Sequence, residues 1–161
     1  MEDINENPSE SKKVNFIKVD VDFFGKDLRI DTYAKRALNW AKNNLVNDVG
    51  VECKCLGKKV YFSTNKINHT IGHKRNRRPQ DYTHEIIAVI SVLSELITDQ
   101  NTEFRYSQDD KNDRVNILKI HKLKGKIEIN NTIKEIEIII RETYLNKDEI
   151  KLIFYNHAFI L

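Results

Sequence analysis

The chain has 161 residues, a length typical of one domain that can bury a core without disulfides or metals. Its formal net charge is only +3, so the overall balance of charge predicts no particular partner, and the distribution of charge along the chain is more informative. No segment approaches the roughly 20 apolar residues that cross a bilayer, and no charged-then-apolar segment opens the sequence. We therefore expect a cytoplasmic protein with no membrane contact.

The sequence lacks the common cofactor motifs. Cys53 and Cys55 are its only cysteines, and their C-x-C spacing is typical of two residues on the same face of a strand. Two cysteines are too few for a closed four-ligand zinc site, and neighbouring strand residues suit disulfide geometry poorly. No glycine-rich phosphate loop, dinucleotide fingerprint or hydrolase nucleophile elbow occurs. We therefore expect reduced thiols and no cofactor.

An acidic tail is expected before the folded part of the chain. Residues 1–13 are polar, carry four acidic side chains in the first ten positions, and offer little to bury, so we expect disorder there. A single domain is expected over residues 14–161. Its first predicted element is a strand within residues 14–24, where apolar side chains alternate with polar ones.

A helix and a hairpin are predicted next. Residues 31–45 form an amphipathic helix that Asp31 or Thr32 can cap. The apolar stripe of this helix comprises Tyr33, Ala37, Ala41 and Leu45, joined by Leu38. Residues 51–63 then alternate as two strands around a turn at Gly57.

Two further helices are predicted before the strand-rich half. A short one over residues 65–74 is capped by Ser63 or Thr64, and Pro79 then interrupts the chain. The strongest helical pattern spans about residues 81–98 and should form the core helix. Its apolar set is Ile86, Ile87, Val89, Ile90, Leu93, Leu96 and Ile97.

The second half of the sequence predicts β-structure. Segments rich in Ile, Val, Phe and Tyr are separated by turn-like clusters, which include "KGK" at residues 124–126 and "NNT" at 130–132. The predicted strands are 102–107, 114–124, 126–130, 132–142 and 149–161. Helices followed by a run of strands indicate an α+β fold, with N-terminal helices packed on a curved antiparallel sheet.

Residues 62–78 combine five Lys or Arg residues with two histidines and no carboxylate. His69 and His73 are four residues apart, so they share one face of a helix, with the cations Lys66, Lys74, Arg75, Arg77 and Arg78 around them. Nearby cations disfavour the imidazolium, so a neutral ring beside a bound phosphate could act as a general base. A solvated basic helix with incidental histidines and a zinc site at the histidine pair are the alternatives.

More polar side chains occur on predicted strands. His121 alternates with apolar residues in "RVNILKIHKLK", and Arg141 closes the apolar run "EIEIII". Strand alternation places Tyr155 and His157 on the same side of the last strand. An ordinary sheet-edge histidine and an arginine at the exit of a strand are the structural alternatives. His84, near the start of the long helix, is expected at the surface without a role.

The order of these motifs resembles a polyvalent domain of phage and polymorphic-toxin proteins, related to the barnase–EndoU–colicin–RelE-like nucleases. The resemblance covers roughly residues 31–158 and is carried by "ALNWAKNNL", "VYFS", "NKINHTIGH", "KIHKLK", "IIIRE" and "FYNH". The first family motif matches Phe62, Ser63, Ile67, Thr70 and His73. The last family motif is usually Tyr-Asp-His, and it reads Tyr155, Asn156, His157 here, so an amide replaces a carboxylate.

The resemblance implies a metal-independent ribonuclease site on the open face of the sheet. Its catalytic candidates by matching position are His73, His121, Arg141 and His157, with Tyr155 beside them. In that mechanism one histidine removes the proton of an RNA 2′-hydroxyl, a second protonates the leaving 5′-oxygen, and the arginine stabilises the phosphorane. The implied substrate is RNA such as tRNA, the implied role is a toxin or phage effector, and an inhibitor or immunity protein is an expected partner.

Two other functions fit the same residues. A non-catalytic nucleic-acid-binding module would retain the fold and the basic helix, and its affinity would fall as salt rises. A protein-interaction module would use the acidic tail and an exposed sheet edge.

Overall fold

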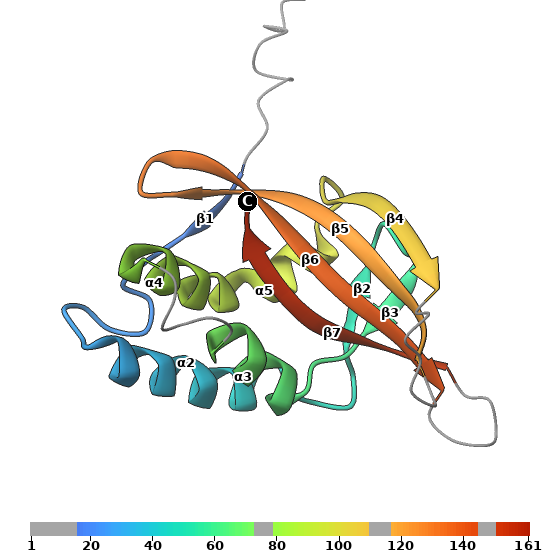
Figure 1. Ribbon diagram of the computed structural model, residues 1–161, viewed down its shortest axis with the longest axis horizontal. Helices are drawn as coiled ribbons and strands as arrows, with labels where there is room; N and C mark the ends of the chain where they lie inside the picture. The colour runs from blue at the N-terminus through green and yellow to red at the C-terminus, as the bar shows by residue number, and fades with distance from the viewer. Residues whose placement is uncertain (1–15, 73–78, 110–116, 145–150) are drawn as a thin grey trace, which may run out of the picture.

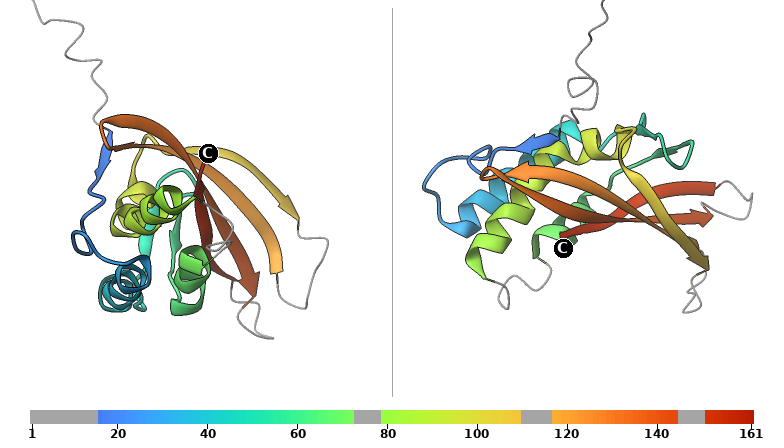
Figure 2. Two further views of the ribbon diagram at one scale, coloured as in Figure 1. Left: turned by 60° about the vertical axis from the view of Figure 1, so that its left-hand side comes forward. Right: turned by 90° about the horizontal axis from the view of Figure 1, so that it is seen from above.

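A computed structural model describes residues 16–72, 79–109, 117–144 and 151–161 of the chain (Figure 1). It confirms the α+β class, with the helices mainly in the first half of the chain and the sheet mainly in the second. Figure 2 shows the described helices gathered on one side of a curved sheet. The sheet therefore has one helix-covered face and one face that no described helix covers.

The main sheet has the strand order β1-β5-β6-β7, and β4 pairs with the same edge of β5 as β1. The pairings are antiparallel except that β1 runs parallel to β5. The strands are β1 (Ile17–Val19), β4 (Glu103–Asp109), β5 (Ile117–Ile129), β6 (Thr132–Tyr144) and β7 (Lys151–Ile160). Asn130 and Asn131 have positive φ of 51° and 61°, as expected for a two-residue hairpin turn between β5 and β6.

The predicted turn at residues 124–126 is wrong, because β5 runs through it as one strand. Gly125 lies in mid-strand, opposite Ile136 of β6. A Cβ at this position would lie 3.1 Å from the Leu96 side chain and 3.3 Å from the Thr102 hydroxyl. The glycine therefore serves close packing of a helix against the strand and not a change of chain direction.

The helices follow the predicted apolar stripes. They are α2 (Ile30–Asn44), α3 (Thr64–Gly72), α4 (Gln80–Val89) and α5 (Leu93–Thr98), and a 3₁₀ turn over Ile90–Val92 joins the last two. All seven apolar residues predicted for the core helix are buried. The helix is nevertheless interrupted, and at this point the Ser91 hydroxyl donates a hydrogen bond of 2.7 Å to the Ala88 carbonyl. Such back-bonding by serine is a common cause of helix bending.

The predicted caps are correct for α3 and wrong for α2. The Lys66 backbone N–H donates to the Ser63 hydroxyl over 3.3 Å, so Ser63 caps α3 as expected. The N-cap of α2 is Arg29, which forms no side-chain cap, and Asp31 lies inside the first turn. An acidic side chain there still favours the helix through its dipole.

The short hairpin forms where predicted, but its strands are shorter. They are β2 (Val51–Cys53) and β3 (Lys58–Val60), paired antiparallel. Cys55 lies in the turn, so the two cysteines are not both within a strand as expected. Their sulfurs lie 3.7 Å apart, and both cysteines are free thiols.

The chain after β3 lines the free edge of β7. The Tyr61 backbone N–H donates to the Ile153 carbonyl over 2.8 Å, and the Tyr155 N–H donates to the Tyr61 carbonyl over 2.9 Å. This bridge brings the start of α3 beside the last strand, although about 90 residues separate them in sequence. The candidate site lies at this junction.

Candidate anion-binding site

Helix α3 is anchored against β7 by apolar and polar contacts. Ile67 and Ile71 are buried in the core, as the sequence predicted. The Thr70 hydroxyl lies 2.5 Å from the Tyr155 hydroxyl in a buried hydrogen bond. With that face of the helix held inward, Lys66 is half-buried and His69 is exposed.

A pocket of about 340 Å³ lies where α3 meets β6 and β7. It is lined by Ser63, Lys66, Arg141, Thr143, Phe154, Tyr155 and Asn156. We refer to it as the Lys66–Arg141 pocket, after the two cations that come from α3 and β6. No carboxylate is among these lining residues, so within the described part of the chain no charge in the wall compensates the two cations.

The electrostatics of Lys66 reflect this arrangement. Burial lowers the pKa of its ammonium group, and the positive charge of Arg141 lowers the pKa further. Both effects disfavour the charged lysine. A bound anion would oppose both, because it interacts favourably with the two cations at once.

Two buried polar atoms in the wall of the pocket lack hydrogen-bond partners among the described residues. They are Nε of Arg141, a donor, and Oδ1 of Asn156, an acceptor. Asn156 is only 6% exposed, so its amide oxygen is largely removed from water. Buried polar atoms without partners cost about 1–3 kcal/mol each and are rare in folded proteins. Their occurrence together in one pocket indicates a site for a ligand that carries both an acceptor and a donor.

A pair of histidines adjoins the Lys66–Arg141 pocket. The rings of His69 on α3 and His157 on β7 are 5.5 Å apart in an edge-on arrangement. The Asn156 side-chain amide donates to Nδ1 of His157 over 2.8 Å, and Phe159 stacks on the same ring at 5.7 Å. Because Nδ1 accepts this bond, the neutral ring of His157 carries its proton on Nε2.

The prediction that Tyr155 and His157 share a side of the last strand is wrong. Along β7 the register places His157 opposite Ile139 and Tyr155 opposite Ile140, with Asn156 as the extra residue of a β-bulge. Neighbouring residues of β6 point to opposite faces, so the two β7 side chains do as well. Tyr155 is fully buried on the helix side, where burial raises the pKa of its phenol. Its hydroxyl is committed to Thr70 and holds α3 in place.

His121 does not converge with Arg141. Ile120 of β5 pairs with Arg141, and His121 pairs with Ile140, so the two side chains leave the sheet on opposite faces. His121 is buried on the helix side, where its Nε2 lies 3.7 Å from a carboxylate oxygen of Glu142 and its Nδ1 hydrogen-bonds with the Ser107 hydroxyl.

The environment of His121 favours its neutral form. Burial lowers the pKa of the imidazole, and the nearby Glu142 carboxylate only partly opposes this effect. The Lys58 ammonium lies 3.2 Å from the buried Glu142 carboxylate, although the Lys58 side chain itself is 53% exposed. The Lys58–Glu142 pair ties the short hairpin to the sheet, whereas Arg141 leaves the sheet on the face opposite to His121.

The remaining predicted residues are placed as follows. His73 and the basic residues Lys74, Arg75, Arg77 and Arg78 lie outside the described residues. His84, expected at the surface without a role, is half-buried. It stacks on Tyr33 at 4.0 Å, and its Nε2 lies 2.8 Å from the Val21 carbonyl oxygen, so it is a packing residue.

Several wall residues were not among the sequence candidates for the site. Ser63 was predicted as a helix cap and as a match to the first family motif, and Asn156 was noted only as a departure from the last one. Thr143, two residues after Arg141 on β6, carried no functional signal. Phe154 was noted only within the "FYNH" motif, because it lies beside Arg141 only through the register of β6 and β7. His69 was predicted on the basic face of the helix, beside a bound phosphate, and the structure brings its ring to His157.

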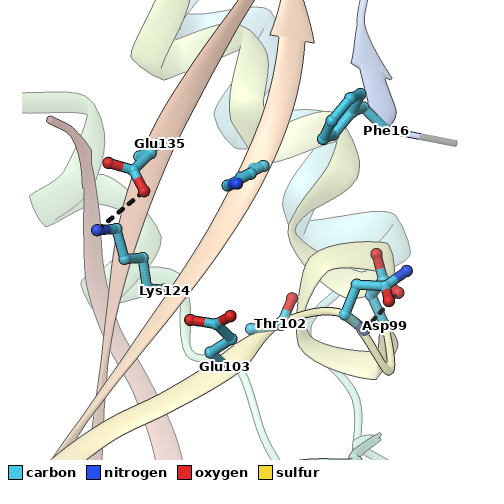
Figure 3. A pocket seen from close by; sticks show the side chains of 8 residues that line it. Phe16, Asp99, Thr102, Glu103, Lys124 and Glu135 are labelled. Carbon is cyan, nitrogen blue, oxygen red and sulfur yellow. Dashed lines mark hydrogen bonds and ion pairs between the residues drawn. The ribbon is translucent and has the colours of Figure 1, made fainter. Parts of the chain in front are cut away.

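A second pocket of about 230 Å³ differs in its charge (Figure 3). It is lined by Phe16, Asp99, Asn101, Thr102, Glu103, Lys124, Lys126 and Glu135. Its two lysines face three carboxylates, and Lys124 forms an ion pair of 2.8 Å with Glu135. Because its charges are compensated within its own wall, this pocket offers no comparable attraction for an anion.

The fold and the site define an α+β domain with helices on one face of its sheet and a cationic pocket where α3 meets β7. The family model of large polyvalent protein-associated domain 3 matches residues 29–155, and the chain therefore belongs to this family. No match is found among curated proteins or among solved structures. In the described part of the chain, no helix has the length and apolar character needed to span a membrane.

Proposed function

We propose that this protein is a metal-independent endoribonuclease that cleaves RNA by attack of the 2′-hydroxyl on the adjacent phosphorus. The observation that supports this most directly is the uncompensated Lys66–Arg141 pocket beside the His69–His157 pair. The pocket offers positive charge for a phosphate, and the pair offers two groups that transfer protons near neutral pH. The resemblance to phage and toxin nucleases is consistent with this activity and with a role as a cytoplasmic effector.

In this proposal the phosphate of the scissile bond lies between Lys66 and Arg141. These cations, with the unpartnered Nε–H of Arg141, stabilise the negative charge of the phosphorane as it forms. His157 is assigned, in its protonated imidazolium form, as the donor to the leaving 5′-oxygen, because a neutral imidazole is too weak an acid for this step. His69 is assigned as the base that takes the 2′-hydroxyl proton. The products are a 2′,3′-cyclic phosphate and a 5′-hydroxyl end.

His121 and Tyr155 have no catalytic part in this proposal. His121 lies on the opposite face of the sheet from Arg141, and the Tyr155 hydroxyl is held by Thr70. His73, which the family motif marks, remains a candidate on the sequence alone. These assignments separate residues that act on the substrate from residues that support α3 and the hairpin.

A non-catalytic nucleic-acid-binding module is the rival function. The observation that favours it is that Nδ1 of His157 is already occupied by Asn156, while the two cations of the pocket need no proton transfer to bind phosphate. This rival predicts RNA binding that weakens with salt and no cleavage.

The test is incubation of the purified protein with total RNA in the presence of EDTA. We expect cleavage that leaves cyclic-phosphate ends and that falls by about 10²–10⁴-fold in His157→Ala and His69→Ala. Arg141→Ala should lower it at least as much, whereas Arg105→Ala, which removes an exposed arginine from β4, should leave it intact. His73→Ala tests the additional candidate from the motif.

Two outcomes decide between the functions. Binding of RNA without cleavage of any RNA would reject the enzyme and support the binding module. Cleavage that persists in both histidine variants would reject the assigned acid and base. Circular dichroism of each variant shows whether a loss of activity reflects a loss of fold.

A further inference from the structure

We infer that Asn156 selects ribonucleotides over deoxyribonucleotides in the bound state, by accepting a hydrogen bond from a ribose hydroxyl while Lys66 and Arg141 hold the adjacent phosphate. This inference rests on the proposed function for the position of the RNA, but it concerns binding and needs no cleavage. It adds a second source of RNA specificity to the requirement for a 2′-hydroxyl nucleophile.

The first support is the pair of unsatisfied atoms in the pocket wall. Nε of Arg141 needs an acceptor and Oδ1 of Asn156 needs a donor, and neither finds one among the described residues. An inorganic anion without protons would satisfy only the arginine. A ligand that satisfies both atoms must combine an anionic group with a neighbouring hydroxyl or amine.

The second support is that the other half of the Asn156 amide is committed. Its Nδ2 group donates to Nδ1 of His157 over 2.8 Å, which orients the amide plane. The carbonyl oxygen therefore cannot rotate away without the loss of this bond. Because Asn156 is the extra residue of the β7 bulge, the backbone also fixes it at the junction between the pocket and His157.

The third support is the size and chemistry of the pocket. Its volume of about 340 Å³ is at the lower end of the roughly 300–1,000 Å³ typical of small-ligand sites. A volume of this order suits one nucleotide. A ribonucleoside 3′-phosphate carries a hydroxyl on the carbon next to its phosphate-bearing carbon, so it provides the anion and the donor together. The half-buried ring of Phe154 in the same wall offers an apolar surface for the rest of the ligand.

The test compares two ligands that differ by one hydroxyl. Adenosine 3′-monophosphate and 2′-deoxyadenosine 3′-monophosphate are titrated into the wild-type protein, with inorganic phosphate as the reference for the anion alone. Neither nucleotide has a bond for the enzyme to cleave, so calorimetry or chemical-shift titration reports binding only. We expect the ribonucleotide to bind about 5- to 10-fold more tightly, as one hydrogen bond to a buried acceptor provides.

Variants assign this preference to Asn156. Asn156→Leu keeps a similar volume without an acceptor and should bring the ratio of the two affinities to about one. Asn156→Asp keeps an acceptor, so it should weaken both affinities through its charge while it retains the preference for the ribonucleotide. Asn68→Leu, an exposed substitution on α3, is the matched control and should behave as wild type. Arg141→Ala should lower the affinity of the protein for both nucleotides by the same factor.

The outcomes distinguish this inference from the proposed function. Equal affinity of the wild type for the two nucleotides, or no binding of either, overturns the inference even if RNA is cleaved. A preference that survives in a folded Asn156→Leu variant also overturns it. A ribonucleotide preference in a protein that cleaves no RNA would retain the inference and reject the nuclease.

Discussion

The hydroxyl groups of Thr70 and Tyr155 lie 2.5 Å apart and connect α3 to β7 inside the core. Two residues that precede Thr70 on the same helix contribute to the site, because Lys66 lines the Lys66–Arg141 pocket and His69 contacts the His157 ring. This one buried bond therefore joins the helix that carries two candidate site residues to the strand that carries a third.

Removal of either hydroxyl should destabilise the protein. We expect Tyr155→Phe and Thr70→Val each to lower the free energy of unfolding by about 1–2 kcal/mol, because each leaves a buried partner without its bond. The double variant should cost less than the sum of the two, which urea denaturation measures as a coupling energy. Tyr61→Phe, which removes the hydroxyl of a half-buried residue in the neighbouring segment, is the control. Strictly additive effects would show that the two hydroxyls act independently.

Loss of one cation from the pocket should change the response of the protein to phosphate. Phosphate at ten times its dissociation constant should stabilise the wild type by about 1.4 kcal/mol, because it binds only the folded state. Lys66→Met should lose most of this gain, since one of the two cations that hold the anion is removed. Thermal unfolding in phosphate and in chloride at equal ionic strength measures the difference.

The exposed Lys35 of α2 provides the matched control for this experiment. Lys35→Met removes the same charge from the surface, so it should leave the stabilisation by phosphate unchanged. A loss of equal size in Lys35→Met would show that phosphate acts through the net charge of the protein and not through the Lys66–Arg141 pocket.

Acid should destabilise the fold through His121. Burial lowers the pKa of this imidazole in the folded state, so the unfolded chain binds the proton more readily. The stability from this group is complete above the unfolded pKa of about 6.5 and is lost as the pH falls below that value. The slope from one such group is at most about 1.4 kcal/mol per pH unit.

Urea denaturation between pH 8 and pH 5 tests this sign. His121→Gln should have a shallower dependence on pH than the wild type, even if it is less stable throughout. A wild type that gains stability as the pH falls toward 5, with the gain absent in His121→Gln, would mean that the Glu142 carboxylate outweighs burial.

Lys58 should stabilise the buried Glu142 carboxylate. The side chain of Glu142 is 6% exposed and its oxygen lies 3.2 Å from the Lys58 ammonium. Removal of the cation in Lys58→Met should cost about 1 kcal/mol, because a buried carboxylate loses a charged partner that solvent partly screens. The double variant Lys58→Met/Glu142→Gln should recover part of the lost stability, since a neutral amide needs no counter-charge. Lys59→Met, at the neighbouring exposed position of β3, is the control for charge alone.

Two glycines should respond differently to the same substitution. Gly50 and Gly57 both have positive φ, at 72° and 65°, so alanine costs about 1 kcal/mol at either from the backbone alone. A Cβ at Gly50 would also lie 2.9 Å from the Val60 carbonyl, whereas nothing lies within 4 Å of one at Gly57. Gly50→Ala should therefore lower the midpoint of urea denaturation more than Gly57→Ala. Equal midpoints would show that the backbone around Gly50 relaxes without cost.

The local elements of the fold were readable from the sequence because they depend on periodicity. The buried stripe of α2 from Tyr33 to Leu45 and the burial of Ile67 and Ile71 follow from helical spacing. The two-residue turn at Asn130 and Asn131 follows from the tolerance of asparagine for positive φ. Short motifs in the right order also indicated the polyvalent-domain family, to which the chain belongs.

Other features depended on contacts between segments that are distant in sequence. Gly125 was taken for a turn, and only the proximity of Leu96 and Thr102 shows why a strand needs a glycine there. One extra residue in β7 reverses the side to which Tyr155 points relative to His157, and a bulge leaves no mark in the alternation of residue types.

The same limit applies to the candidate site. Residue types alone made Lys66, His69, Arg141 and His157 candidates for a phosphate site, since cations and imidazoles suit phosphate chemistry wherever they occur. The register of β5 against β6 places His121 and Arg141 on opposite faces of the sheet. The pairing of Tyr61 with β7 brings the residues of α3 beside those of the last strand. A shift of register by one residue would exchange the two faces of a strand without any change in its composition, so the grouping of these side chains is a property of the tertiary structure alone.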